Sequence, residues 1–453
     1  MQTTITSVQN TDTSIPENQE VSPDIDYYSL EFNRKNIELL NKNIRLVDSD
    51  PATGLDQFCY IKCEDSDPEI FKQSRGVIFK GDDVVMRGFP YTIEYTENNN
   101  GKEITDNIEN IFDKCMFYDS YEGSTIRMFY YGEKWYLSTN RKLDAFRSKW
   151  ASRESFGSFF QKALEYEVEN NKGLSDALNF NKETDNIIEK FQAILDKSKQ
   201  YMFLLLNNDE NRIVCDAPEH PTVFHVGTFI NFELSMDEDI YIPQPKKHEF
   251  TNIGELYTYV NQVNYKNLQG VIVFAPDNKQ YKIFNDEYKN LYAVRNNEPS
   301  IKFRYLQVRM NKKYNDALHF LYPNFTSAFE EYENSLHDIA KEIQNSYISR
   351  FIKKEYVSVD VNRYKIISSL HQWHTLDRSQ NKISLDKTIE VMNEQSPTTL
   401  NRMIRNTMLE KQGITPPVRV SRNIRQENAA KEHTPLLRRK PTTTKPVVSD
   451  ETF

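Results

Sequence analysis

The first two thirds of the chain, from Tyr27 to about Arg295, alternates between short strand-like runs and helical stretches. The strand-like runs are rich in β-branched and aromatic residues and end at Gly, Asp, Asn or Pro, which is typical of strands joined by turns. The expected strands span residues 75–80, 83–90, 115–120, 124–131, 134–140, 201–206 and 270–276. The apolar spacing is helical between Lys142 and Lys199. Residues 96–107 have the Gly- and Asn-rich chemistry of an exposed loop.

The run 124–131 carries the clearest two-residue period. Its side chains alternate between two faces, one with Thr125, Arg127, Phe129 and Tyr131 and the other with Ile126, Met128 and Tyr130. This pattern predicts a sheet with one packed face and one face turned toward a cleft.

After Ile301 the strand signals give way to helical spacing. One amphipathic helix is marked by apolar residues three or four positions apart, at Phe329, Tyr332, Leu336, Ile339, Ile343 and Tyr347. Further helices are expected in residues 361–374 and 384–410. We therefore predict an α+β protein with antiparallel sheets in residues 26–300 and a mostly helical domain in 301–410. A disordered tail is expected at 1–25, and a disordered, net-positive one at 411–453.

Composition narrows the classes of function. The chain has 453 residues and a formal net charge of −9, which argues against a protein coated with nucleic acid but permits a local basic groove. No apolar run reaches the roughly 18–20 residues that cross a bilayer, and the first residues do not have the pattern of a signal peptide. Four scattered cysteines, Cys59, Cys63, Cys115 and Cys215, favour a reducing, cytoplasmic compartment over a disulfide framework.

Six short segments occur in an order that resembles the phage-type ATP-dependent RNA ligases of the covalent nucleotidyltransferase superfamily. They read SRGVIF (74–79), MRGFPYTIEY (86–95), SYEGS (120–124), FLLLNNDENRIV (203–214), NLQGVIVF (267–274) and QYKIFNDEY (280–288). The resemblance covers roughly Ser74 to Arg295, and the helical region behind it matches the position of that family's C-terminal domain. It implies a nucleotidyltransferase domain built of antiparallel sheets.

The resemblance also implies a demanding reaction. In these ligases a lysine attacks the α-phosphate of ATP, and AMP then passes to an RNA 5′-phosphate with the help of Mg²⁺ and carboxylates. In this sequence the nucleophile's position holds Ser120. The family's other lysine and glutamate positions are also changed, at Tyr91, Leu205, Gln269 and Phe284. Several positions that would contact the nucleotide are kept or remain suitable, namely Arg75, Arg87, Glu122, Gly123, Arg127 and Lys282.

These substitutions leave three hypotheses open. A non-catalytic module would bind RNA or a nucleotide in the old cleft and would need no cofactor or metal site. Its phosphate contacts would come from Arg75, Arg87, Arg127 and Lys282, and Tyr121 or Phe284 would stack on a base. An active enzyme would use a relocated nucleophile, for which Lys282 is the best substitute, together with ATP and Mg²⁺. An interaction protein would bind another protein, and a viral origin would suit it because related folds occur in phages and large DNA viruses.

Overall fold

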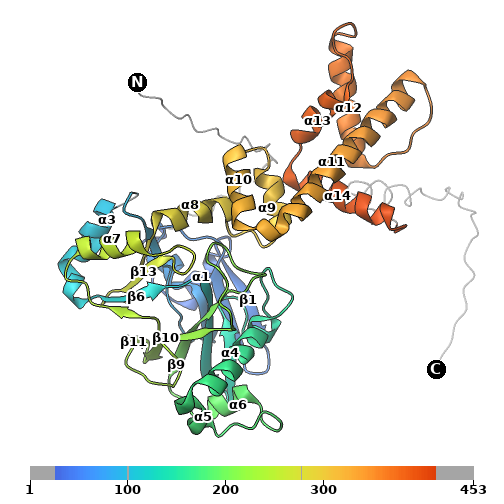
Figure 1. Cartoon of the computed structure of the whole chain (residues 1–453). Helices are drawn as coiled ribbons and strands as arrows, with labels where there is room; N and C mark the ends of the chain where they lie inside the picture. Colours follow the sequence, from blue (N-terminus) through green and yellow to red (C-terminus); the bar gives the residue numbers. More distant parts are fainter. Residues whose placement is uncertain (1–25, 99–100, 277, 415–453) are drawn as a thin grey trace, which may run out of the picture. The chain divides into compact units, whose positions relative to one another are not determined.

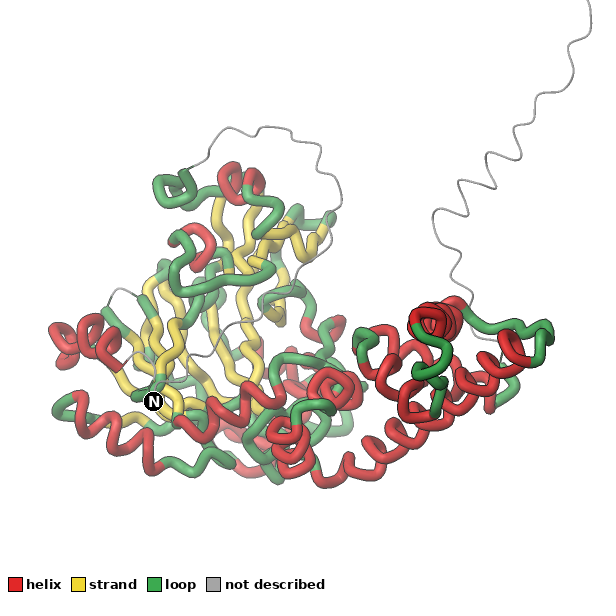
Figure 2. The backbone as a smooth tube through the Cα atoms, turned by 90° about the horizontal axis from the view of Figure 1, so that it is seen from above, coloured by secondary structure: helices red, strands yellow, loops and turns green. Residues whose placement is uncertain are grey.

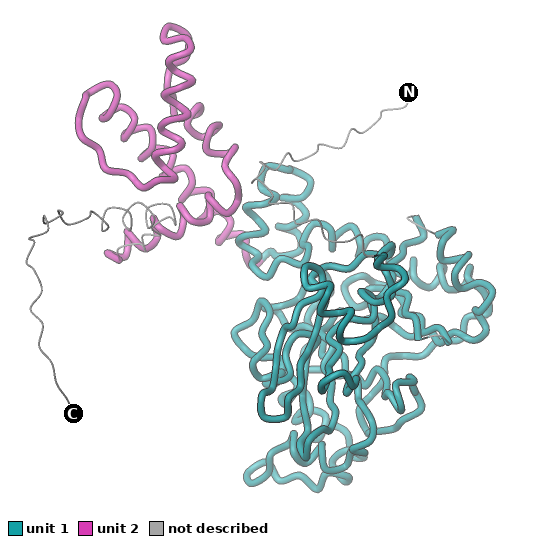
Figure 3. Tube along the Cα trace, turned by 180° about the vertical axis from the view of Figure 1, so that it is seen from behind, with its two compact units in different colours: residues 1–323 teal, residues 324–453 magenta. Residues whose placement is uncertain are grey.

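The computed structural model describes residues 26–98, 101–276 and 278–414. The chain forms two compact units, residues 1–323 and 324–453 (Figure 3), and each is described by itself. The tail expected at 1–25 and residues 415–453 of the tail expected at 411–453 lie outside the described residues, whereas Lys411 still ends a helix. Within the described residues, no helix is long and apolar enough to cross a membrane.

The first unit begins with a four-stranded antiparallel sheet in the order β1-β2-β3-β4. Its strands are β1 (Ile44–Asp50), β2 (Leu55–Tyr60), β3 (Arg75–Lys80) and β4 (Asp83–Met86). Two short helices, α1 (Arg34–Leu39) and α2 (Glu69–Gln73), contribute Ile37, Ile70 and Phe71 to the apolar core on this sheet.

Two five-stranded sheets complete the β-structure of this unit (Figure 1). One has the order β11-β10-β9-β7-β8, with β7 (Gly123–Tyr131), β8 (Lys134–Thr139), β9 (Gln200–Leu206), β10 (Val223–Ile230) and β11 (Glu233–Ser235). The other has the order β12-β6-β13-β14-β5, with β5 (Ile93–Tyr95), β6 (Met116–Ser120), β12 (Lys247–His248), β13 (Gly270–Phe274) and β14 (Gln280–Phe284). The chain passes from β6 of one sheet to β7 of the other through Tyr121 and Glu122 alone.

Helices lie around these sheets, as Figure 2 shows for the strands (yellow) and helices (red) of this unit. One apolar core packs α4 (Phe156–Asn170), α5 (Lys172–Leu178) and α6 (Ile187–Ala193) against strands β7 to β10. A second packs α3 (Gly101–Ile108) and α7 (Ile253–Gln262) against strands β5, β6, β13 and β14. The unit ends with α8 (Asp286–Arg295), α9 (Ile301–Val308) and α10 (Lys312–Leu321).

In the second unit, all the regular secondary structure of the described residues is helical. It contains α11 (Thr326–Tyr347), a π-helical turn η4 (Ile348–Ile352), α12 (Val361–Leu376), α13 (Leu385–Asn393) and α14 (Pro397–Lys411). The six apolar positions that predicted α11 are all buried, which confirms the amphipathic assignment.

The predicted fold class, α+β with antiparallel sheets and a helical C-terminal region, is confirmed, and all seven predicted strands are present. One prediction was wrong: residues 101–108 form helix α3 instead of a loop. Ile104 and Ile108, four positions apart, are fully buried there, and this packing outweighs the loop-like composition.

A second expectation also failed, because β7 has no face open to a cleft at its centre. Ile126 and Met128 enter one apolar core and Phe129 enters another.

The division between units falls after Pro323, whereas the helical spacing placed it near residue 300. Helices α9 and α10 pack with α8, so they belong to the first unit.

Candidate functional site

The turn between β6 and β7 is where the resemblance places the catalytic lysine. Ser120 ends β6, and Gly123 begins β7 opposite Leu206 of β9. A Cβ atom at Gly123 would lie 2.6 Å from the carbonyl oxygen of Leu205, so only glycine lets the two strands approach this closely. The link is therefore held firmly between the two sheets.

Glu122, inside this link, is only 6% exposed, and its carboxylate is an acceptor for one loop of the same unit. It accepts hydrogen bonds from the backbone N–H groups of Ile213, Val214 (2.8 Å) and Cys215 (3.2 Å). Asn207 donates to it at 3.4 Å through its side-chain amide. Its oxygens are thus occupied by the protein itself, and they have little capacity left for a ligand.

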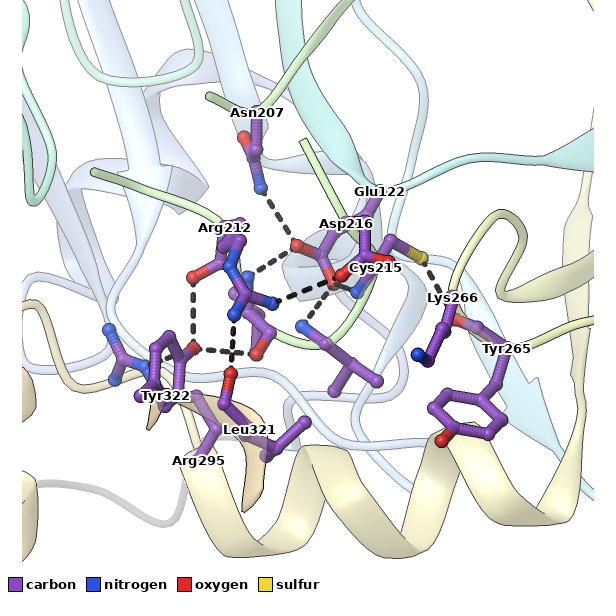
Figure 4. A network of polar contacts seen from close by, with 12 residues as sticks. Glu122, Asn207, Arg212, Cys215, Asp216, Tyr265, Lys266, Arg295, Leu321 and Tyr322 are labelled. Atoms are coloured by element: carbon purple, nitrogen blue, oxygen red, sulfur yellow. Dashed lines mark hydrogen bonds and ion pairs between the residues drawn. The ribbon is translucent and has the colours of Figure 1, made fainter. Parts of the chain in front are cut away.

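The loop that Glu122 holds is also held from its other side (Figure 4). The Tyr322 hydroxyl lies 3.0 Å from the carbonyl oxygen of Arg212 and 2.6 Å from that of Ile213, and it accepts from the Arg295 guanidinium at 2.9 Å. Arg212 in turn donates to the carbonyl oxygen of Leu321. Residues 212–215 are consequently fixed by side chains that lie about 90 to 110 positions away in the sequence.

A second polar group surrounds Ser120. Its hydroxyl donates to Oε1 of Gln269 at 3.1 Å, and Lys282 Nζ donates to the same oxygen at 3.0 Å. The Gln269 amide donates to the Tyr288 hydroxyl at 2.6 Å, and this hydroxyl donates to Glu122 at 3.1 Å. One chain of hydrogen bonds that ends on Glu122 therefore connects Ser120, Gln269 and Lys282. The sequence analysis had marked the first two as replaced ligase residues and the third as a retained one.

Electrostatics make Lys282 unusual within this group. Burial lowers the pKa of its ammonium, and the nearby cations of Arg75 and Lys289 lower it further, against the opposing effect of Glu94 and Glu122. Glu94 is already paired with Lys289 at 2.6 Å. The Lys282 ammonium thus has Gln269, a neutral amide, as the hydrogen-bond acceptor that the structure shows for it.

The three predicted arginines lie in different surroundings. Arg75 donates to neutral acceptors, the carbonyl of Pro90 at 3.2 Å and the hydroxyl of Thr92 at 3.4 Å. Arg87 packs its guanidinium over the ring of Phe32 at 4.4 Å, and burial lowers its pKa. Arg127 is fully buried and donates to the carbonyls of Gly76 and Thr139, so it joins two sheets instead of lining a cleft.

The side chains at the remaining predicted positions are apolar or aromatic, and they already pack against other residues. Leu205 points into the core beneath α4 and α6, and Phe284 stacks on Tyr288 with ring centroids 5.4 Å apart. Tyr91 packs edge-on against Tyr60, and burial raises the pKa of its phenol. Tyr121, a predicted base-stacking residue, already packs on Phe224 at 4.8 Å. Of these four residues, none brings a charge to the turn between β6 and β7.

The ligase family implies a Mg²⁺ ion, and the residues present do not fit one. Two of the expected carboxylate positions hold Leu205 and Gln269, and the carboxylate of Glu122 is occupied by backbone N–H groups. Across the described ranges, no three His, Cys, Asp or Glu side chains gather as metal ligands. A cavity of about 20 Å³ beside Glu122 and Cys215 has room for about one water molecule.

Two features of the site escaped the sequence analysis. Tyr288 was not singled out, although it connects Gln269 with Glu122. The sequence pointed to Tyr288 only by its position in QYKIFNDEY, the last of the six segments that resemble the RNA ligases. The backbone donors of residues 213–215 gave none, because a main-chain N–H is present at every non-proline residue.

The chain matches no protein-family model. It is 28% identical over 368 residues to an immediate-early protein ICP-46 homolog of Invertebrate iridescent virus 6, covering 76% of this chain and 79% of that protein. It is 30% identical over 326 residues to the ICP-46 homolog of Invertebrate iridescent virus 3, covering 70% and 68%.

Ligases are also among the similar proteins. A putative bifunctional polynucleotide kinase/RNA ligase of Autographa californica nuclear polyhedrosis virus is 24% identical over 292 residues, which is 61% of this chain and 39% of that protein. A putative ATP-dependent DNA ligase from Aquifex aeolicus superposes with a TM-score of 0.36 at 12% identity, covering 88% of this chain and 86% of the ligase. The sequence similarity supports a ligase-like protein, and the extent of the match to the relative from Invertebrate iridescent virus 3 shows that the chain belongs to the viral immediate-early ICP-46 family.

Proposed function

We propose that this ICP-46 family protein is a ligase-like binding module that holds a phosphate-bearing ligand, a nucleotide or an RNA end, without forming a covalent AMP intermediate. One observation carries the proposal. Lys282 is a partly buried cation beside Arg75, and both donate to neutral acceptors in the hydrogen bonds that the structure shows. A cation that is partly removed from water and has no hydrogen-bonded carboxylate is disfavoured, and a bound phosphate would offset that cost.

The same residues argue against the covalent step. The Ser120 hydroxyl donates its proton to Gln269, and no imidazole or carboxylate accepts from it in the structure to act as its base. Gln269 cannot take up a proton, and Glu122 is occupied by the loop at residues 213–215. The charge that gathers on a transferring phosphoryl group would therefore lack the metal and carboxylates that usually stabilise it.

Titration calorimetry with ATP and with a short 5′-phosphorylated RNA tests the proposal. We expect binding that weakens with salt and falls by a factor of roughly 10 or more in Lys282→Gln, because a charge-assisted hydrogen bond contributes about 1.5–3 kcal/mol. Lys182→Gln is the matched control, since Lys182 is an exposed lysine of the same unit paired with Glu169. Wild-type protein that binds neither ligand at moderate salt would refute the proposal and favour the interaction-protein hypothesis.

A second candidate deserves a test because of one property of Lys282. A lowered pKa increases the fraction of neutral amine, which is the form that attacks phosphorus. In an active ligase, Lys282 Nζ would bond to the α-phosphate of ATP and pyrophosphate would leave. Incubation with α-labelled ATP and Mg²⁺, followed by a denaturing gel, would then give a labelled band that disappears in Lys282→Ala.

A further inference from the structure

The junction between α11 and α12 in the second unit exposes apolar side chains. Helix α11 continues into the π-helical turn η4, and such turns are rare and often lie at functional sites. In the segment that follows, Ile352 is 66% exposed and Tyr356 is 93% exposed. A ring as open as that of Tyr356 buries almost none of its apolar surface, so it contributes little to the packing of this unit.

Beside this segment, two half-buried rings form a parallel pair. The centroids of Phe351 and His371 are 3.8 Å apart with an interplanar angle of 13°. The buried Tyr347 supports both: its ring lies 5.1 Å from that of Phe351, and its hydroxyl lies 3.4 Å from Nδ1 of His371. Contacts with the buried Tyr347 thus hold both rings of the pair in place.

Cations gather around the rings with few anions among them. Lys354 and Arg378 are exposed and form no ion pair with the described residues. Together with His374 they lower the pKa of His371, after the larger effect of burial. The carboxylate of Asp377 is taken up by Ser379 and Gln380.

Among the other charged groups near these rings, cations also outnumber unpaired carboxylates. Arg350 lies over the rings of Phe351 and Tyr364, at 5.8 and 5.3 Å from their centroids. Asp360 is 3.4 Å from the guanidinium of Arg363 and caps α12. Glu355 and Asp377 are exposed carboxylates in no ion pair among the described residues, and of the two only Asp377 accepts the hydrogen bonds of neighbouring groups given above. The local charge is therefore positive, although the whole chain carries −9.

We propose that the basic aromatic surface formed by Phe351, Lys354, Tyr356, His371 and Arg378 binds single-stranded nucleic acid. Exposed rings offer stacking platforms for unpaired bases, and the two cations lie beside them to meet the phosphates. A duplex keeps its bases stacked on one another, so it can use the cations but not the rings. This surface lies within the second unit and is separate from Lys282, so the inference does not depend on the proposed function.

Fluorescence anisotropy of the full-length protein with a short labelled single-stranded RNA tests this inference. Each measurement is made in a Lys282→Gln background, which weakens the cationic site of the first unit. Tyr356→Ala should weaken binding roughly 5- to 150-fold, the range expected for losing one stacked base. Because Tyr356 is almost fully exposed, this substitution should leave the helical content and the melting temperature unchanged.

A charge variant gives an independent readout. Lys354→Gln combined with Arg378→Gln should reduce the slope of log affinity against log salt by about 1.4, or about 0.7 for each lost phosphate contact. The matched controls are Lys341→Gln, an exposed lysine of α11 without an ion pair among the described residues, and Tyr28→Ala, a 76% exposed tyrosine of the first unit. Both controls should bind as tightly as the parent.

Three results would overturn the inference. The first is equal binding by the Tyr356→Ala protein and its parent. The second is equal affinity for the single strand and for a duplex of the same sequence, because a duplex cannot stack on the rings. The third is binding to phosphatidylserine vesicles with none to RNA, which would assign this surface to an anionic membrane.

Discussion

Glu122 gives the sharpest test of how the site is built. If its carboxylate holds the loop at 213–215, Glu122→Ala leaves three backbone N–H groups without their acceptor. Each unsatisfied buried donor costs about 1–3 kcal/mol. The cavity of about 20 Å³ beside Glu122 can admit water, so we expect the lower part of the summed range. The predicted loss in the free energy of unfolding is about 3–5 kcal/mol.

Glu122→Gln separates shape from charge. The glutamine keeps the volume but turns one acceptor into a donor that faces N–H groups, so we expect a loss of about 1.5–3 kcal/mol. The matched control is Glu210→Gln. Glu210 also accepts from a backbone N–H and a hydroxyl, those of Arg153 and Ser152, but it does so on an exposed loop, where we expect a loss of about 1 kcal/mol or less.

Urea unfolding monitored by circular dichroism, combined with hydrogen exchange, measures both effects. The amide protons of residues 213–215 should exchange faster in Glu122→Ala, and the midpoint of unfolding should fall. If Glu122→Ala unfolds within about 0.5 kcal/mol of the wild type, with unchanged exchange at these amides, the reasoning is refuted. The carboxylate would then be free to serve a ligand.

Three further substitutions probe other parts of the first unit. Lys282→Met should raise the free energy of unfolding of the ligand-free protein by about 1 kcal/mol at pH 7 in a urea titration, because burial disfavours the charged form; a decrease would mean that an anion already compensates this cation. Burial lowers the pKa of His225 to about 4 from 6.5, so the unfolded state binds the proton first as the pH falls. Urea titrations at pH 7 and pH 5 should show that His225→Gln loses about 2 kcal/mol less than the wild type on acidification, and equal losses would contradict this assignment. Gly76→Ala should lower the melting temperature more than Gly81→Ala, since both have positive φ but only a Cβ at Gly76 would meet the Asn140 backbone, at 2.8 Å; equal shifts would show that this contact does not matter.

Much of the fold could be predicted because its strands carry local signals. The runs that became β3, β6, β7 and β13 combine β-branched and aromatic residues with clear turn residues at their ends. Helix α3 was missed because its stability comes from two isoleucines that meet side chains of α7 and β13, and composition alone does not report such contacts. Burial of both faces of β7 was missed for a similar reason, since alternation cannot distinguish a cleft from a second core.

The site was predictable only as far as the resemblance extended. It led to Ser120, Gln269 and Lys282, and the structure does bring these three together. It misplaced the roles of Glu122 and Arg127, which were expected to contact a ligand. Their partners are backbone groups: loop N–H groups for Glu122, and the carbonyls of Gly76 and Thr139 for Arg127. Such partners have no sequence signature, so their roles emerge only from the folded chain.

The central claim, a ligase-like scaffold without covalent chemistry, is tested most directly by the mass of the intact protein. The full chain would be incubated with ATP and Mg²⁺ in the absence of RNA, so that no acceptor can remove AMP from the protein, then denatured and weighed by mass spectrometry. We predict an unmodified mass in wild-type protein that still binds 5′-phosphorylated RNA or ATP by calorimetry. A mass increase of one AMP, absent from Lys282→Ala, would contradict the claim and establish Lys282 as the nucleophile.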